Sequence, residues 1–293
     1  MNPGIAYATL AFAAWGLFPL YFRQIASVHP LEVVLHRSVW SLLFVLVLLA
    51  ALRRFDGLRA LAATPRKLGL LAFSALLLSS NWLIYVYAVQ SGQVVEASLG
   101  YFINPIVNVL LGVLVLRERL NPVQWTAVAL AAAGVLWLTL LYGRLPWIAL
   151  VLALSFGLYG LLRKTSPLGP LEGLAAETML LAPLMLPALL WWTLRGDGAM
   201  ARGDLALDAW LVIGGPLTAL PLLLFAAGAR RLPLTTVGLL QYLSPTIQLA
   251  LGVWVFHEPF DRARLVGFAF IWAALLLYTL DGLRRGRDSA APA

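Results

Sequence analysis

Long apolar runs recur along the whole chain, separated by short segments that carry charged residues, proline or glycine. Each run is roughly 20 residues long, the length that a helix needs to cross ~30 Å of hydrocarbon. The runs are too continuous for strands, whose apolar and polar residues would alternate in a lipid-facing barrel. The pattern predicts ten helices, near residues 4–22, 31–52, 68–90, 97–116, 123–142, 146–162, 172–194, 209–228, 235–256 and 264–282.

Composition supports an all-α integral membrane protein with the lipid bilayer as its surroundings. Of 293 residues, 61% are hydrophobic and 12% charged, whereas soluble domains average about 45–50% and ~25%. A soluble fold of this size has too little interior for so much apolar side chain. The absence of cysteine excludes disulfides and thiolate metal sites, and three histidines leave little for a metal cluster or imidazole catalysis. We therefore expect no metal, no cofactor and no catalytic residues.

Charge distribution predicts the orientation. Fourteen Lys and Arg residues fall on one side of the predicted spans, six on the other, and only Arg37 lies inside a span. The positive-inside rule then places both termini in the cytoplasm. The net charge of +8 is scattered over many short loops, so it does not indicate nucleic-acid binding.

The sequence repeats itself at an offset of 140 residues. Leu99–Asn121 aligns without a gap on Leu239–Asp261, with coincident prolines (Pro105/Pro245) and acids (Glu118/Glu258). Five spans in each copy is an odd number, so the second copy crosses the membrane inverted. We predict one repeat over residues 1–143, a second over 144–283, and a cytoplasmic tail at 284–293. Inverted repeats are typical of transporters, although duplication could also simply build a stable bundle.

Two matched polar stripes lie near the middle of spans four and nine. Side-chain amides at that depth need partners in neighbouring helices, in a bound solute or in a water-filled cavity. We predict a substrate-binding cavity between the repeats, and interhelical hydrogen bonding is the alternative. Residues of spans one and three are included because the rings of Trp15, Trp82 and Tyr85 can stack on a planar solute, and Asn81 lies beside Trp82 and Tyr85 on the same turn. The predicted substrate-binding residues are Tyr101, Asn104, Asn108, Gln241, Ser244, Gln248, Asn81, Trp82, Tyr85 and Trp15.

Charged residues inside or beside the spans predict gates. Arg37 lies about 9 Å inside the boundary at 1.5 Å per residue, where a charge is costly unless it is paired. Glu96 is its predicted partner, and a snorkelling arginine is the alternative. Glu177, the mate of Arg37 at the 140-residue offset, is expected to contact Arg163 or Lys164 at the other end. The predicted gating or ion-pair residues are His36, Arg37, Glu96, Arg163, Lys164 and Glu177.

Several strings resemble a known family: LHRSVWS (35–41), NWLIYVYAV (81–89), EASLGYFINP (96–105), YGLLRK (159–164) and LQYLSPTIQ (240–248). They are similar to the RarD permeases, of the EamA group within the drug/metabolite transporter superfamily. The resemblance covers nearly the whole chain except its last ten residues. It implies ten helices, inverted five-helix repeats, an inner-membrane location, and export or exchange of small metabolites or drugs.

These observations predict a secondary transporter that moves a small organic metabolite or drug by alternating access. No Walker-type Gly-x-x-x-x-Gly-Lys string is present, so ATP is not its direct energy source. A membrane-embedded enzyme is one alternative, but no histidine is placed to activate a serine in either half. A structural membrane protein is another, but it has no need of matched amides at mid-bilayer. The substrate, the direction of transport, proton coupling and a homodimer are left open.

Overall fold

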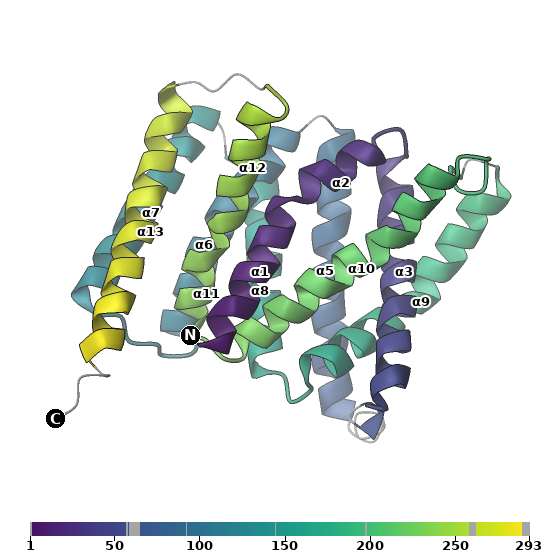
Figure 1. The fold of residues 1–293 in the computed structure, drawn as a ribbon, viewed down its shortest axis with the longest axis horizontal. Coiled ribbons are helices and arrows are strands. Elements are labelled where there is room, and N and C mark those ends of the chain that lie inside the picture. The colour runs from purple at the N-terminus through teal and green to yellow at the C-terminus, as the bar shows by residue number, and fades with distance from the viewer. Residues whose placement is uncertain are drawn as a thin grey trace.

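The computed structural model describes residues 2–56, 58, 65–91, 93–143, 145–196, 198–257 and 262–288. Within these ranges the protein is all-helical and contains no strand, which confirms the predicted fold class (Figure 1). The helices are α1 (Pro3–Gly16), α2 (Phe18–Gln24), α3 (Pro30–Leu52), α5 (Pro65–Gln90), α6 (Val94–Leu114), α7 (Pro122–Tyr142), α8 (Trp147–Thr165), α9 (Pro170–Leu194), α10 (Leu205–Ala229), α11 (Leu234–Gln241), α12 (Leu243–Trp254) and α13 (Arg262–Asp288).

Helix starts follow from local sequence. Proline opens α3, α7 and α9 at Pro30, Pro122 and Pro170, because the first helical position needs no backbone N–H donor. The side chain of Asn121 accepts from the Gln124 backbone N–H, and Gln124 bonds back to the Asn121 backbone, so α7 begins with a capping box. The predicted spans agree with the helices to within four residues at every end but one: α13 continues to Asp288, six residues beyond its predicted end and into the predicted tail.

Two of the ten crossings are broken rather than continuous. The first crossing consists of α1 and α2, which meet at Leu17, and the ninth consists of α11 and α12, which meet at Tyr242. In each case a proline lies in the first turn of the second piece (Pro19, Pro245), where it costs no helical hydrogen bond. Pro105, by contrast, lies inside an unbroken α6. The sequence prediction treated all ten spans as continuous and missed both breaks.

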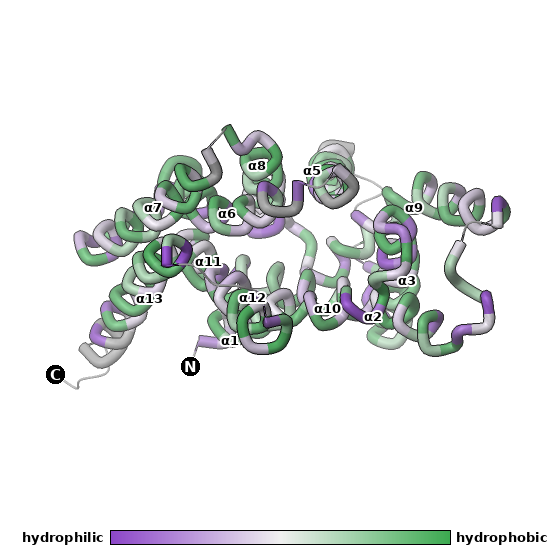
Figure 2. Tube along the Cα trace, turned by 90° about the horizontal axis from the view of Figure 1, so that it is seen from above, coloured by the Kyte–Doolittle hydropathy of each residue, from purple (hydrophilic) through white to green (hydrophobic). Residues whose placement is uncertain are grey.

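Helix packing follows the internal repeat. At the 140-residue offset the helix pair α6–α8 corresponds to the pair α12–α1. In the same way α1–α10 corresponds to α8–α5, and α3–α10 corresponds to α9–α5. The two helices of each of these six pairs are in contact. The pairs α7–α13, α3–α9 and α6–α11 join equivalent helices of the two halves (Figure 2). Tyr242 Oη donates to the carbonyl oxygen of its own mate, Phe102, at 3.2 Å. The ten crossings therefore form two inverted five-helix repeats. The repeats meet where the equivalent helices α6 and α11–α12 pack against each other.

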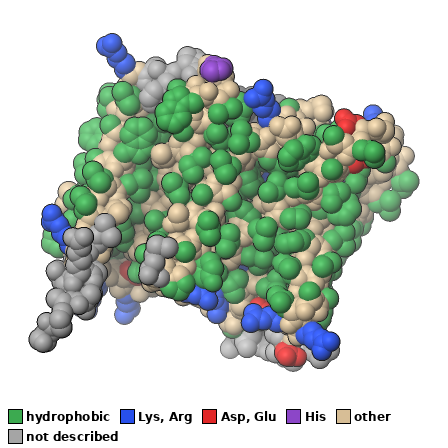
Figure 3. Space-filling view, in the orientation of Figure 1, with side chains coloured by type: hydrophobic (Ala, Val, Ile, Leu, Met, Phe, Trp, Pro, Cys, Tyr) green, Lys and Arg blue, Asp and Glu red, His purple; other side chains and the backbone are tan. Residues whose placement is uncertain are grey.

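The start of α1 and the end of α13 lie at the same face of the bundle, which is the lower face in Figure 1. We call this the terminal face and the opposite one the distal face. Hydrophobic side chains cover the middle of the surface, and charged ones gather towards the two faces (Figure 3). Large apolar residues near the middle of the spanning helices are strongly exposed, for example Leu76 of α5 at 59% and Leu184 of α9 at 63%. Such a surface fits lipid rather than water, as expected for a multi-pass membrane protein.

Candidate functional site

A cavity of about 210 Å³ lies between the two repeats. Its wall is built by α1, α2, α3, α5 and α6 of the first repeat and by α8, α10, α11 and α12 of the second. Nine of the ten predicted substrate-binding residues line it, the exception being Asn108. The lining residues are Trp15, Phe18, Pro19, Phe22, Arg37, Leu78, Asn81, Trp82, Tyr85, Ala97, Gly100, Tyr101, Asn104, Leu152, Phe156, Thr218, Leu222, Gln241, Ser244, Pro245 and Gln248.

Hydrogen bonds to neighbouring helices hold several of the lining polar groups. Asn81 Nδ2 donates to the Leu152 carbonyl and to Ser155 Oγ, both at 2.9 Å. Ser244 Oγ donates to the Phe12 carbonyl at 2.6 Å, and Gln248 Nε2 donates to the Trp15 carbonyl at 3.1 Å. Each bond ties a helix of one repeat to a helix of the other. The polar wall of the cavity is therefore already oriented.

Asn108 does not line the cavity, although the polar stripe of span four predicted it as a substrate-binding residue. It is fully buried one turn below Asn104, where its Nδ2 donates to Asn104 Oδ1 at 3.2 Å and to Gln241 Oε1 at 2.8 Å. For Asn108 the interhelical alternative therefore holds, because α11 packs directly against this turn of α6. Asn104 and Gln241, which it joins, both line the cavity.

An aromatic cluster, Phe12, Trp15, Phe156, Tyr159 and Phe225, forms the floor of the cavity. Neighbouring ring centroids lie between 5.4 and 6.3 Å apart, and Tyr159 is stacked on Phe225. Trp15 and Phe156 face the cavity, whereas the other three rings are almost completely buried. We call this cluster the aromatic floor.

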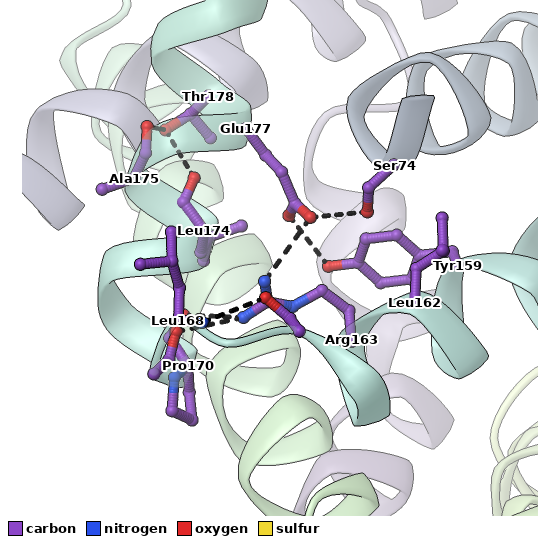
Figure 4. Close-up of polar contacts among 12 residues, drawn as sticks. Ser74, Tyr159, Leu162, Arg163, Leu168, Pro170, Leu174, Ala175, Glu177 and Thr178 are labelled. Atoms are coloured by element: carbon purple, nitrogen blue, oxygen red, sulfur yellow. Dashed lines mark hydrogen bonds and ion pairs between the residues drawn. The ribbon is translucent and has the colours of Figure 1, made fainter. Parts of the chain in front are cut away.

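A buried polar network lies immediately beyond the floor (Figure 4). The carboxylate of Glu177 accepts a hydrogen bond from Ser74 Oγ at 2.6 Å and one from Tyr159 Oη at 3.3 Å. Arg163 Nη1 lies 3.6 Å from Glu177 Oε1, and neither side chain is more than 1% exposed. Arg163 Nη2 also donates to the carbonyls of Gly169 and Pro170 in the connection to α9. The predicted contact between Glu177 and Arg163 is present.

Lys164 does not reach Glu177, which corrects the other predicted partner. Its ammonium donates to the carbonyls of Ala229 and Leu232, at the end of α10. In the opposite direction, Arg230 Nη1 at the end of α10 donates to the carbonyls of Ser166 and Leu168, which follow α8. Lys164 is one residue on from Arg163 and therefore points about 100° away around the helix. These bonds tie the α8–α9 and α10–α11 connections together at the terminal face.

Arg37 is placed differently from the prediction. Its Nε donates to Thr218 Oγ1 at 2.8 Å, and its guanidinium carbon lies 5.5 and 5.4 Å from the ring centres of Phe18 and Phe22. Glu96 instead accepts from the Ile148 backbone N–H at 2.7 Å, at the first turn of α8. The predicted Arg37–Glu96 pair is therefore wrong, because α6 packs on α8 while α3 packs on α10.

His36 faces away from the cavity. Its Nε2 lies 3.6 Å from Glu32 Oε1, and its Nδ1 accepts from Trp40 Nε1 at 3.3 Å. Glu32 also accepts from the Ala199 backbone N–H at 2.6 Å, which ties α3 to the connection before α10. The consecutive residues His36 and Arg37 thus point in different directions, and of the two only Arg37 lines the cavity.

Three important lining residues were missed by the sequence analysis: Phe18, Phe22 and Thr218. The spacing of Phe18 and Phe22 is a usable signal, since i and i+4 share a helix face. Thr218 corresponds to Leu78 at the 140-residue offset and so shows no matched polarity. Glu258 lies outside the described residues. Its mate Glu118 accepts from the backbone N–H groups of Leu234 and Thr235 and so caps the start of α11.

Comparison with known proteins agrees with this architecture. The EamA-like transporter family matches the chain twice, over residues 2–140 and 145–280. An uncharacterized transporter of Pseudomonas aeruginosa is 46% identical over 100% of this chain and 98% of its own length. Protein RarD of Streptomyces exfoliatus is 47% identical over 98% of this chain and 91% of its own. Protein RarD of Escherichia coli is 41% identical, over 98% and 97%.

One solved crystal structure shares the fold, with a TM-score of 0.73 at 17% sequence identity over 94% of this chain and 97% of the other. The resemblance to RarD permeases that the sequence motifs indicate is thus supported by full-length relatives. The chain belongs to the EamA-like transporter family.

Proposed function

We propose that this protein is a secondary transporter that moves a small organic solute across the bacterial inner membrane by alternating access. Residues 1–143 and 144–283 would be the two moving halves, with residues 284–293 as a tail and both termini in the cytoplasm. The observation that carries this proposal is a cavity lined by helices of both repeats. Two related halves around one site can exchange conformations and so expose that site to either side in turn.

The cavity lies in the distal half of the bundle, which supports a gate on the terminal side. Lining residues come from α2, which is the distal part of the first crossing (Phe18, Phe22), from the distal half of α5 (Tyr85) and from the distal start of α6 (Ala97). Towards the terminal face the path meets first the aromatic floor and then the Glu177 network. Under the proposed topology this conformation is open to the outside and closed to the cytoplasm.

Sequence differences between the repeats support this asymmetry. At the 140-residue offset, Phe12, Trp15 and Phe225 correspond to Leu152, Ser155 and Tyr85, while Phe156 and Tyr159 correspond to Gly16 and Pro19. Five rings on the terminal side are thus replaced by one ring on the distal side. Bulky rings close a path that small side chains leave open, so the chain favours the distal-open arrangement.

Counterflow in proteoliposomes tests the proposal, with solutes chosen by a thermal-shift screen of the purified protein. We expect uptake that is accelerated by the same solute on the opposite side. The double variant Asn104→Ala/Gln248→Leu should lose most of this flux, because both amides line the cavity. Thr246→Val, on the same helix as Gln248 but outside the cavity lining, is the matched control. Full flux in the double variant would refute the cavity assignment, and flux without acceleration would refute alternating access.

A further inference from the structure

Arg37 is the one charged residue among those that line the described cavity. Its Nε donates a hydrogen bond to Thr218 Oγ1, and its guanidinium carbon lies near the rings of Phe18 and Phe22. Within the part of the chain that the structure describes, no carboxylate forms an ion pair with it and its two Nη groups make no hydrogen bond. The planar end of the guanidinium therefore faces the cavity with its donors unused.

The pseudo-symmetric mate of Arg37 shows how differently this chain treats its other deeply placed charge. Glu177 has Arg163 at 3.6 Å and hydrogen bonds from Ser74 and Tyr159. A charge in low-dielectric surroundings is costly unless it is paired, and ring faces compensate an arginine only in part. The charge of Glu177 is therefore compensated by an arginine of the protein, whereas no described carboxylate compensates that of Arg37.

We propose that the transported solute is an organic monoanion whose carboxylate binds the two Nη groups of Arg37. This inference rests on the proposed transport function. A guanidinium presents parallel N–H donors that match the two oxygens of a carboxylate. Trp15, Trp82 and Phe156 line the same cavity and offer ring faces to a flat apolar body. Asn104 and Gln248 remain for hydroxyl or carbonyl groups of the solute.

The same lining argues against zwitterions and cations. The residues that line the cavity include four with side-chain amides, Asn81, Asn104, Gln241 and Gln248, but no aspartate or glutamate. An ammonium group would therefore enter without an ionic partner and would meet the positive charge of Arg37 at close range. The cavity volume, about 210 Å³, is below the ~300–1,000 Å³ of sites for drug-sized ligands, so it suits a metabolite-sized anion.

Three probes with one skeleton test the proposal: 3-phenylpropanoate, its neutral amide, and phenylalanine, which adds an ammonium group. Thermal shift of the purified full-length protein is measured at rising concentrations of each. We expect 3-phenylpropanoate to raise the Tm at concentrations at least tenfold lower than those that the other two need. An equal or stronger response to the amide or to phenylalanine, or no response to 3-phenylpropanoate, would overturn the proposal. This comparison uses the unmodified protein.

Variants then assign the effect to Arg37. Arg37→Gln should weaken the response to 3-phenylpropanoate at least tenfold and abolish its advantage over the amide, while Arg37→Lys should keep part of that advantage. Arg23→Gln is the matched control, since Arg23 is exposed at the same end of the bundle, lies 5.6 Å from the Phe256 ring and does not line the cavity. A carboxylate response that survives Arg37→Gln would overturn the proposal.

Counterflow with the same probes separates this inference from the transport function. Uptake of the amide or of phenylalanine without uptake of 3-phenylpropanoate would overturn the anion proposal and leave transport standing. Binding of 3-phenylpropanoate through Arg37, with no uptake of any probe that binds, would support the anion site and contradict transport. Counterflow of 3-phenylpropanoate that Arg37→Gln abolishes and Arg23→Gln preserves is the expected result.

Discussion

Replacing Glu177 by glutamine should weaken the closure of the terminal side. The amide keeps the size of the carboxylate but leaves Arg163, which is 1% exposed, without its counter-charge. Removing one partner of a buried ion pair costs about 3–5 kcal/mol, whereas an exposed pair contributes about 0–1 kcal/mol. If the gate hydrates both groups when it opens, the substitution penalises only the closed state. A difference of about 2 kcal/mol already corresponds to a ~30-fold shift of the equilibrium towards the terminal-open state.

Single-cysteine labelling measures this shift directly, because the natural chain has no cysteine. Ser244→Cys introduces one thiol into the cavity wall, with little change of side-chain volume. A membrane-impermeant maleimide is then offered from either side, in right-side-out and inside-out vesicles. We expect labelling from the distal face in the Ser244→Cys parent, and an at least tenfold faster labelling from the terminal face after Glu177→Gln.

Two further variants control the interpretation. Glu172→Gln removes a carboxylate of the same helix, 3.8 Å from a guanidinium of Arg54 that is 62% exposed, and should leave the labelling unchanged. Arg163→Met added to Glu177→Gln removes the stranded cation and should restore part of the closed state. Unchanged terminal-face labelling in a folded Glu177→Gln protein would refute the reasoning and make the network a static structural element.

Three more substitutions have expected outcomes. Glu118→Ala removes the acceptor for the N–H groups of Leu234 and Thr235, so thermal denaturation should show a loss of about 1–3 kcal/mol; an unchanged Tm would contradict the capping role. Gly215→Ala places a Cβ 2.4 Å from the backbone and Cβ of Trp40, and should destabilise α3–α10 packing by about 1–3 kcal/mol, whereas the Cβ of Gly69→Ala, inside α5, meets nothing within 4 Å and should cause no loss of stability. Asn108→Ala should lower stability by about 0.6–2 kcal/mol through the lost interhelical bond to Gln241 and leave the KM of counterflow unchanged; a raised KM would return Asn108 to the binding site.

Sequence alone determined the spans, the repeat and the helices that carry the polar residues. Apolar run length set the ten crossings because the bilayer sets the length of a spanning helix. Coincident residues at the 140-residue offset, such as Pro105 and Pro245, identified the two halves and hence the inverted arrangement. The sequence also narrowed the partner of Glu177 to Arg163 or Lys164, since inversion brings all three to the same end of the bundle, and the structure shows that the partner is Arg163.

Which side of each helix faces the cavity depends on how the helices pack. In a bilayer the lipid is as apolar as the protein interior, so apolar periodicity does not distinguish an outward from an inward face. Asn104 and Asn108 look alike in the sequence, yet the approach of α11 makes the first a cavity residue and buries the second. Arg37 likewise meets Thr218 rather than Glu96, because the order of helices around the bundle places α10, not α6, beside α3.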